Sequence, residues 1–161
     1  MKYFKQEKGY TCGCACFRMV LSQLNILVPS EEELEEQMGC IPESGTHYNN
    51  MIDIAKKYGL QCQYGEHGSL DYLDSLIEKG WAVVIAFSCD VPHFAVYTGN
   101  NGNHLFLNDP TFGEKHSHLI RKFVNSHWLI DVSLYKVAIA EMYLELDPTL
   151  NTDKWWVAYK Q

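Results

Sequence analysis

The sequence lacks a long hydrophobic run. Its longest apolar stretch, WAVVIAF at residues 81–87, is much shorter than the roughly 20 residues that a membrane-spanning helix requires. The opening residues, MKYFKQEKGY, contain no apolar core of the kind that a secretory signal peptide has. The sequence therefore predicts neither a membrane span nor export, and we expect a cytoplasmic protein.

Basic residues are scarce as well. The chain has 161 residues, with 13 lysines and arginines against 20 aspartates and glutamates, so its formal net charge is −7. Because no long basic run is present either, nucleic acids and anionic membranes are poor partners. Repeats, low-complexity segments and linkers are also missing. Since 47% of the residues are hydrophobic and can build a core, we expect a single domain over residues 1–161.

The hydrophobic pattern changes along the chain from the period of helices to the period of strands. Helical spacing and capping signals predict helices at residues 12–24, 30–39, 46–59 and 69–80, and a short helical piece at 120–128. Apolar runs and alternations predict strands at residues 60–64, 81–88, 93–99, 104–109, 134–146 and 155–160. Helices followed by an antiparallel sheet indicate an α+β fold, in which residues 131–161 extend the sheet.

Capping residues mark where the predicted helices begin. Thr11 precedes the first helix and Thr46 begins the third, each with a side chain suited to accept a hydrogen bond from the first turn. Ser30 and Glu33 have the spacing of a capping box. The many glutamates that follow Ser30 predict a helix face in water rather than a binding site.

Three cysteines occupy alternate positions in QEKGYTCGCAC, residues 6–16, where the first helix begins. A helix N-terminus supplies N–H groups and a partial positive charge that stabilise a thiolate, the nucleophilic form of cysteine. Cys12 lies in the first turn on the core-facing side, whereas Cys14 lies about 200° around the helix axis from it. Cys12 is therefore the candidate nucleophile. Gly13 has no side chain and leaves room for a substrate, so we expect it to contact substrate.

The other cysteines have simpler explanations. A Cys-x-Cys pair on a helix directs its sulfur atoms apart, and no second pair completes four ligands, so we expect no metal and no cofactor. The alternate spacing is also too tight for easy mutual bridging, and the missing export signal favours reduced thiols. We interpret the remaining five as small buried hydrophobic residues: Cys14, Cys16, Cys40, Cys62 and Cys89.

A thiolate needs a base, and the base needs an orienting group. His93 opens an alternating strand, and Asp109 ends the next strand, directly before Pro110. A two-residue turn between the strands would direct the two side chains to opposite faces of the sheet. A three-residue turn with Gly102 left-handed would place them directly across from each other. The sequence allows both turns, and we expect the second.

The motifs occur in the order seen in a known family. The first is QEKGYTCGCAC, followed by SGTHYNNMIDIAKKYGL, LDSLIEKGWAVVIAF, HFAVYTG, LNDP and GEKHSHLIRKFVNSHW, the last with Phe123 and Trp128. Together they resemble the bacteriocin-processing cysteine peptidases, which cleave double-glycine leader peptides. The resemblance covers residues 4–130 and implies a papain-like fold, with N-terminal helices packed on an antiparallel sheet.

The resemblance also implies functional roles. Cys12 would be the nucleophile, His93 the base and acid, and Asp109 the orienting group. Gln6 would donate its side-chain amide to the oxyanion hole, where the backbone N–H of Cys12 is a suitable second donor. The substrate would be a peptide or protein, with small residues such as Gly-Gly next to the cut bond.

Two features depart from the family. There, this domain often precedes a membrane-spanning ABC transporter, and the absence of a membrane span here argues against a transporter-coupled leader peptidase. Residues 131–161 lie outside the resemblance. Within them, Trp155 and Trp156 either cover the sheet or line a substrate or partner surface.

The sequence thus favours a papain-like cysteine peptidase that hydrolyses peptide bonds. Isopeptidase, amidase and transpeptidase chemistry would use the same residues. Two other functions are kept as alternatives: a non-catalytic or regulatory binding module on the same fold, and a zinc-binding interaction domain that uses the cysteine cluster. The oligomeric state is left open.

Overall fold

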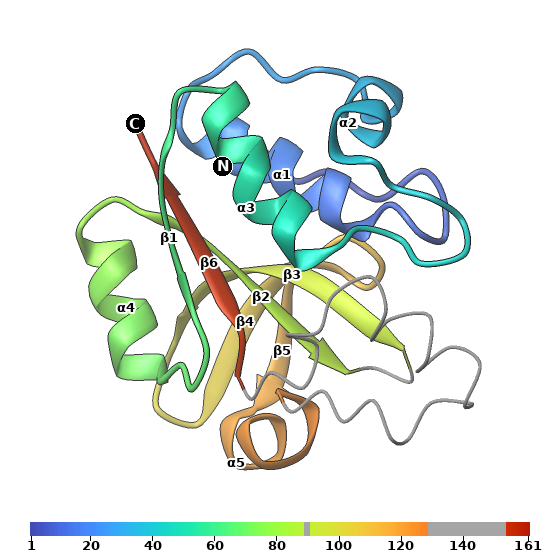
Figure 1. The fold of residues 1–161 in the computed structure, drawn as a ribbon. Coiled ribbons are helices and arrows are strands. Elements are labelled where there is room, and N and C mark those ends of the chain that lie inside the picture. Colours follow the sequence, from blue (N-terminus) through green and yellow to red (C-terminus); the bar gives the residue numbers. More distant parts are fainter. Residues whose placement is uncertain (89–90, 129–153) are drawn as a thin grey trace.

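The computed structural model describes residues 1–88, 91–128 and 154–161 (Figure 1). Its helices are α1 (Cys12–Gln23), α2 (Glu31–Met38), α3 (Tyr48–Lys57), α4 (Leu70–Glu78) and α5 (Ile120–Lys122), and α5 continues as a π-helical turn, η1 (Phe123–His127). Its strands are β1 (Gln61–Gly65), β2 (Ala82–Ser88), β3 (Pro92–Asn100), β4 (His104–Asp109), β5 (Gly113–Leu119) and β6 (Trp156–Lys160). The predicted α+β fold is confirmed.

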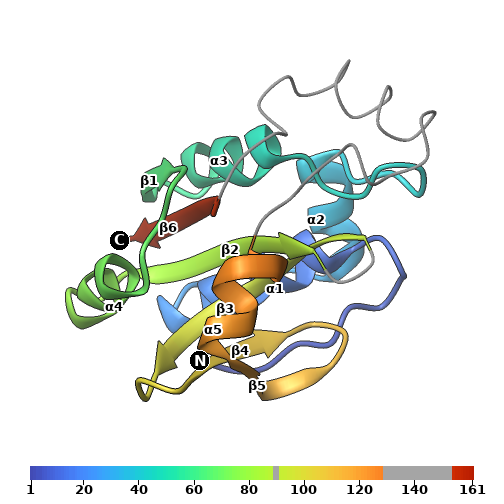
Figure 2. The same cartoon turned by 90° about the horizontal axis from the view of Figure 1, so that it is seen from below.

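One antiparallel sheet contains these strands, in the order β1-β6-β2-β3-β4-β5. Helices α1, α2 and α3 lie together in Figure 1, apart from α4 and α5, and Figure 2 shows α2 and α3 away from α4 and α5. Alternate residues of β2 enter two separate core clusters. Val84 and Ala86 join the cluster that contains α1, and Val83 and Ile85 join the one that contains α4. The central strand is therefore buried on both faces, as its apolar sequence predicts.

The C-terminal strand β6 lies inside the sheet. It pairs with β1 on one side and with β2 on the other. Trp155 and Trp156 are only 4% and 7% exposed and belong to the core clusters on opposite faces. Both tryptophans therefore cover the sheet. The strand predicted at residues 134–146 lies outside the described residues.

The helices begin and end close to where the sequence predicts. The capping box of Ser30 and Glu33 is present, and Gly39 ends α2 in the left-handed conformation. Two predicted caps are wrong: His47 rather than Thr46 precedes α3, and Thr11 makes no side-chain hydrogen bond to the first turn of α1. No helix of residues 1–88, 91–128 and 154–161 has both the length and the hydrophobicity to cross a bilayer.

The β3–β4 hairpin has the predicted glycine conformation but a different register. Gly102 is left-handed, with φ of +85°. Asn100 pairs with Leu105 near the turn, and an irregularity between Tyr97 and Gly99 then shifts the pairing by one residue. The expected three-residue turn is wrong, because the Asn101 N–H donates to the His104 carbonyl at 3.0 Å and only Gly102 and Asn103 lie between these two residues. The bulge then sets the register further along the strands.

Beyond the bulge, Val96 pairs with Asn108. Continuing this pairing brings Asp109 opposite Ala95, which shares a face of the sheet with His93 because alternate residues point the same way. Asp109 is thus not directly across from His93, as expected, but offset from it by two residues. An even offset keeps both side chains on one face of the sheet. The expected shared face of His93 and Asp109 is therefore confirmed, although the expected direct pairing is wrong.

Candidate active site

Cys12 is the first residue of α1. The residue is 8% exposed and joins the core cluster between the helices and the sheet. Thr11 precedes the helix without capping its first turn through the side chain. The N–H groups and the partial positive charge at this helix start therefore act next to the Cys12 sulfur.

His93 and Asp109 form a buried hydrogen bond. The distance from His93 Nε2 to Asp109 Oδ1 is 2.9 Å, and the two residues are 5% and 0% exposed. The side chain of Cys12 lies close enough to the same imidazole to raise its pKa. Side chains from α1 and β4 thus meet at the ring of one histidine on β3. The structure brings together the residues that the sequence predicts for a nucleophile, a base and an orienting group.

The surroundings of His93 favour its charged form. Burial on its own lowers the pKa of a histidine, because it disfavours the imidazolium. Here the hydrogen bonds to Asp109 and Cys12 outweigh burial and raise the pKa of His93 from 6.5 to about 9. Burial also acts to raise the pKa of Asp109, but the hydrogen bond and charge of His93, together with the backbone N–H groups of Phe112 and Thr111, outweigh it and the pKa of this carboxyl is lowered. An imidazolium beside a carboxylate is therefore the favoured state at neutral pH.

The turn after β4 holds the Asp109 carboxylate. Its Oδ1 atom accepts hydrogen bonds from the backbone N–H groups of Thr111 at 2.8 Å and Phe112 at 3.0 Å. The hydroxyl of Tyr3 donates to the backbone carbonyl of Asp109 at 2.8 Å. The orientation of the carboxylate is therefore fixed by backbone groups as well as by His93.

Gln6 lies beside the same turn. Its backbone N–H donates to the Pro110 carbonyl at 3.0 Å, and its side-chain Oε1 accepts from the Thr111 hydroxyl at 2.8 Å. Its Nε2 donates to the carbonyl of Lys8 at 2.8 Å. An amide nitrogen carries two N–H bonds, so this contact uses one of two donors. The structure thus attaches Gln6 to the segment that carries Asp109.

Glu31 is buried next to the loop that leads into α1, although the glutamates after Ser30 predict a helix face in water. It is 2% exposed. Its Oε1 accepts a hydrogen bond from the backbone N–H of Glu7 at 2.7 Å and another from the Thr11 hydroxyl. Arg18 Nη1 lies 3.6 Å from its Oε2. Glu31 therefore ties the loop that leads into α1 to the start of α2, and the expectation of a fully solvated glutamate face is wrong at this position.

Aromatic rings pack around His93. The centroid of its ring lies 5.3 Å from that of Phe87 and 6.4 Å from that of Phe112. Phe87 is buried, but Phe112 is 57% exposed and stacks on His116 at 5.4 Å. Phe112 thus presents an apolar surface beside the imidazole. Sequence reasoning missed it, and its only signal is its position three residues after Asp109.

Gly13 faces the side chain of Thr46. A Cβ atom added to Gly13 would lie 2.5 Å from Thr46 Oγ1 and 2.7 Å from its Cβ. Any side chain at position 13 would therefore overlap Thr46, which gives a packing reason for glycine here. The predicted contact of Gly13 with substrate stays a prediction.

The remaining cysteines are mostly buried, as expected. Cys14 and Cys16 are 0% exposed and Cys40 is 6% exposed, whereas Cys62 is partly exposed. Cys89 lies outside the described residues. The Sγ atoms of Cys14 and Cys40 are 2.9 Å apart, a contact that the local Cys-x-Cys spacing does not reveal. In the part of the chain that the structure describes, no group of three or more His, Cys, Asp or Glu residues is arranged to hold a metal ion.

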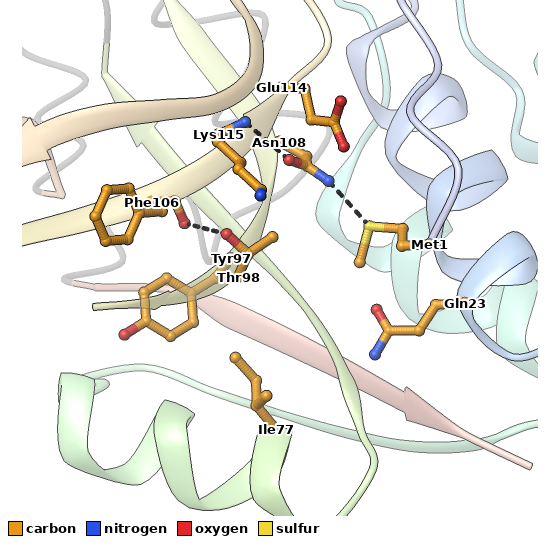
Figure 3. A pocket seen from close by; sticks show the side chains of 9 residues that line it. All are labelled: Met1, Gln23, Ile77, Tyr97, Thr98, Phe106, Asn108, Glu114 and Lys115. Atoms are coloured by element: carbon orange, nitrogen blue, oxygen red, sulfur yellow. Dashed lines mark hydrogen bonds between the residues drawn. The ribbon is translucent and has the colours of Figure 1, made fainter. Parts of the chain in front are cut away.

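A cavity of about 580 Å³ lies elsewhere, and neither Cys12 nor His93 lines it (Figure 3). Inside it, Asn108 Nδ2 donates to the Met1 sulfur at 3.3 Å, and Asn108 Oδ1 accepts from the backbone N–H of Lys115 at 3.0 Å. Its lining residues are Met1, Gln23, Ile77, Tyr97, Thr98, Phe106, Asn108, Glu114 and Lys115. The cavity is therefore not part of the candidate active site.

Comparison with known proteins agrees with this geometry. The sequence profile of the Peptidase C39 family matches residues 1–134. No curated protein sequence matches the chain significantly.

Solved structures similar to the chain cover almost its whole length. A double glycine motif protease from an AMS/PCAT transporter, in complex with the leader peptide, has a TM-score of 0.68 at 20% identity, covering 99% of this chain and 90% of that one. The peptidase domain of Streptococcus ComA, a bi-functional ABC transporter of a quorum sensing pathway, has a TM-score of 0.68 at 14% identity, covering 99% and 100%. A C39-like peptidase from Bacillus anthracis has a TM-score of 0.65 at 12% identity, covering 99% and 94%. These likenesses establish the papain-like fold.

Proposed function

Because the chain belongs to the peptidase C39 family and is thus a cysteine peptidase, we propose that it hydrolyses peptide bonds with a Cys12–His93–Asp109 triad. Cys12 is the nucleophile, His93 is the base and acid, and Asp109 orients His93. The observation that supports these roles most is that the buried ring of His93 hydrogen-bonds to Asp109 at 2.9 Å and is close enough to Cys12 for that side chain to raise its pKa.

The reaction begins with an ionised sulfur. A His93 pKa of about 9 favours an imidazolium at neutral pH, and a thiolate at Cys12 is its natural counterion. The thiolate attacks the carbonyl carbon of the peptide bond, and the imidazolium gives its proton to the leaving amine. Neutral His93 then takes a proton from the water molecule that hydrolyses the thioester. This step releases the second product and restores the ion pair.

Asp109 controls the orientation of the imidazole. Its carboxylate accepts a hydrogen bond from Nε2 of His93, so Nδ1 is the ring nitrogen that exchanges a proton with Cys12. The negative charge of Asp109 also stabilises the imidazolium that carries the transferred proton. The backbone hydrogen bonds from Thr111 and Phe112 keep the carboxylate in this position throughout the cycle.

Gln6 and the backbone N–H of Cys12 form the oxyanion hole in this proposal. Preorganised donors stabilise the charge that develops on the carbonyl oxygen. The Gln6 amide is held by Thr111 and Lys8, and its second N–H bond serves the oxyanion. Because Gln6 is attached to the turn that holds Asp109, the oxyanion donor keeps a fixed position relative to His93.

The proposed substrate is a peptide or protein with small residues, such as Gly-Gly, next to the cut bond. Support comes from the similar structure of a double glycine motif protease bound to its leader peptide. A substrate passing Gly13 would reach the Cys12 sulfur at the start of α1. The chemistry requires a reduced Cys12, in keeping with the expected cytoplasmic location.

Alkylation of Cys12 tests the proposed ion pair. We expect iodoacetamide near pH 6 to label Cys12 faster than every other cysteine, and His93→Ala to slow this labelling. His67→Ala, at an exposed position, is the matched control and should leave the rate unchanged. Slow labelling of all cysteines would favour a non-catalytic binding module. Stoichiometric zinc in the purified protein would favour an interaction domain built on the cysteines.

A peptide library tests the reaction itself. We expect the wild-type protein to cleave peptides after small residues and the Cys12→Ala variant to cleave none. Cleavage only at side-chain amides, or transfer to an added amine in place of hydrolysis, would assign the same residues to isopeptidase, amidase or transpeptidase chemistry. Equal cleavage by both proteins would refute the role of Cys12.

A further inference from the structure

Cys14 and Cys40 form a thiol pair that the proposed mechanism does not use. Their Sγ atoms lie 2.9 Å apart, and the residues are 0% and 6% exposed. Cys14 belongs to α1, and Cys40 follows the glycine that ends α2. We infer that Cys14 and Cys40 are a disulfide-forming site, at which an oxidant of the peroxide class links the start of α1 to the end of α2.

The bond requires little movement. A disulfide has an S–S distance of about 2.05 Å, so the two sulfur atoms must approach by roughly 0.9 Å. The backbone at both ends is already held, because Cys14 lies within a helix and the backbone N–H of Cys40 donates to the carbonyl of Glu35 at 3.0 Å. The two sulfur atoms already face each other in the folded protein, so no segment has to be displaced.

Cys40 is the residue that reacts first. Its sulfur lies 2.8 Å from the hydroxyl of Thr46, which can donate a hydrogen bond to a thiolate. The hydrogen bond with Cys14 lowers the pKa of Cys40, while the same hydrogen bond and burial raise the pKa of Cys14. Cys40 is also the more exposed of the two residues. Its sulfur is therefore the one that ionises and meets the oxidant.

The reaction balances with hydrogen peroxide as the oxidant. The Cys40 thiolate attacks one peroxide oxygen and becomes a sulfenic acid, while hydroxide leaves and takes up the proton that Cys40 had lost. The Cys14 sulfur then attacks the sulfenic sulfur, and its proton leaves with the hydroxyl group as a second water. The two thiols lose two electrons in total, and these electrons reduce the peroxide to two water molecules.

The geometry separates this pair from the catalytic sulfur. Cys12 and Cys14 point in directions about 200° apart on a helix, and Cys12 contacts His93. Cys16 lies one turn from Cys12 and is fully buried. Of the cysteines in the described residues, Cys14 and Cys40 are therefore the two that the fold aligns for bonding. The inference does not depend on the proposed peptidase mechanism.

Mass spectrometry of an oxidised Cys12→Ala variant tests the site, since this variant keeps the reactive sulfur from consuming the oxidant. We expect hydrogen peroxide to remove two hydrogen atoms from the folded protein and to produce one linked peptide pair, Cys14 with Cys40. The bond closes a segment between residues 26 apart in sequence, so the oxidised form should melt about 5–10 °C above the reduced form. Cys62→Ser in the same background is the matched control and should retain the bond.

Failure of the bond to form in the folded protein would overturn the inference, as would linkage of Cys14 or Cys40 to Cys16 or Cys62. Cys14→Ser and Cys40→Ser should each abolish the mass loss and the gain in melting temperature. If either variant fails to fold, wild-type protein is first treated with iodoacetamide to block Cys12 and then oxidised. Identification of its linked peptides by mass spectrometry then shows whether Cys14 bonds to Cys40.

Discussion

Nε2 of His93 lies 2.9 Å from Oδ1 of Asp109, although the pairing of β3 with β4 offsets the two residues by two positions. A diagonal pair on one face of a sheet is still within reach of side chains of this length. The carboxylate reaches the ring because backbone N–H groups of the following turn direct it there. The pKa of His93 is therefore raised by its hydrogen bond to Asp109, and this bond does not require the two residues to be paired directly across the sheet.

Replacing the carboxylate of Asp109 should reduce activity without removing the turn. The Asn side chain in Asp109→Asn can still accept the backbone hydrogen bonds through its oxygen, but it has no charge to stabilise the imidazolium. We expect kcat/KM on a cleaved peptide to fall on the order of 10²–10⁴-fold. Asp53→Asn, at an exposed position on α3, is the matched control and should change kcat/KM little. A fall no larger than that of the control would remove Asp109 from the triad.

The titration of His93 should be directly measurable. NMR of the imidazole should give a pKa of about 9 in the wild-type protein. Cys12→Ala and Asp109→Asn should each lower this pKa, because each variant removes one of the hydrogen bonds that raise it. A wild-type pKa near the ordinary 6.5 would contradict the ion pair.

The same pKa predicts how stability depends on pH. The folded-state pKa of His93 lies above its ordinary 6.5, so protonation stabilises the fold fully below pH 6.5, and this contribution is lost as the pH rises through about 9. The lowered pKa of Asp109 gives a contribution that is present above its ordinary 3.8 and lost on acidification. Thermal denaturation should therefore show the largest difference between wild type and His93→Gln between pH 3.8 and 6.5. The difference should shrink toward pH 9, and a difference that grows there would contradict the assignment.

Local sequence signals account for much of the fold and for the central residues of the site. The capping box at Ser30 and the period-2 pattern around His93 report interactions between neighbours in the chain, so a single sequence is enough to read them. The shared face of His93 and Asp109 was expected from a three-residue turn, and it holds because the shift between Tyr97 and Gly99 leaves the two residues an even number of positions apart in the pairing. Cys12 could be proposed as the nucleophile because a helix start favours a thiolate whatever packs around it, and this role stays a prediction.

Contacts between distant segments could not be predicted in the same way. Glu31 looks like any solvated glutamate in its helix, and it is buried only because the loop before α1 docks on it. The contact of Cys14 with Cys40 depends on the packing of α1 against the end of α2. The position of β6 between β1 and β2 could not be predicted either, because the sequence of a strand does not determine which strands pair with it.

Gly13→Ala should destabilise the protein even though alanine favours helices. The helical preference is worth about 1 kcal/mol in favour of alanine. Against it, the new Cβ would lie 2.5 Å from Thr46 Oγ1, and Thr46 is hydrogen-bonded to Cys40 and cannot easily turn away. We expect a net loss of about 1–3 kcal/mol in the free energy of unfolding, measured by urea denaturation.

Two variants check the cause of this loss. Gly9→Ala should be nearly neutral, because nothing lies within 4 Å of a Cβ atom at that position. Thr46→Gly combined with Gly13→Ala should recover part of the loss by removing the overlapping side chain. Equal stability of Gly13→Ala and wild type would mean that α1 and Thr46 do not pack as closely as described.

Glu31→Gln should impair catalysis from outside the reacting groups. The Glu31 carboxylate accepts hydrogen bonds from Glu7 and Thr11, in the loop between the proposed oxyanion donor and the nucleophile. Neutralising it removes the buried anion near Arg18, which keeps its contact with Glu7 at 3.1 Å, so we expect a loss of about 1–3 kcal/mol in the free energy of unfolding. The Gln oxygen accepts the same hydrogen bonds more weakly than a carboxylate does, so the loop holds the oxyanion donor less firmly and kcat should fall severalfold with KM little changed. Glu32→Gln, one residue along the same helix and exposed, should change neither quantity. A loss of stability with unchanged kcat in the folded fraction would show that Glu31 serves the fold alone.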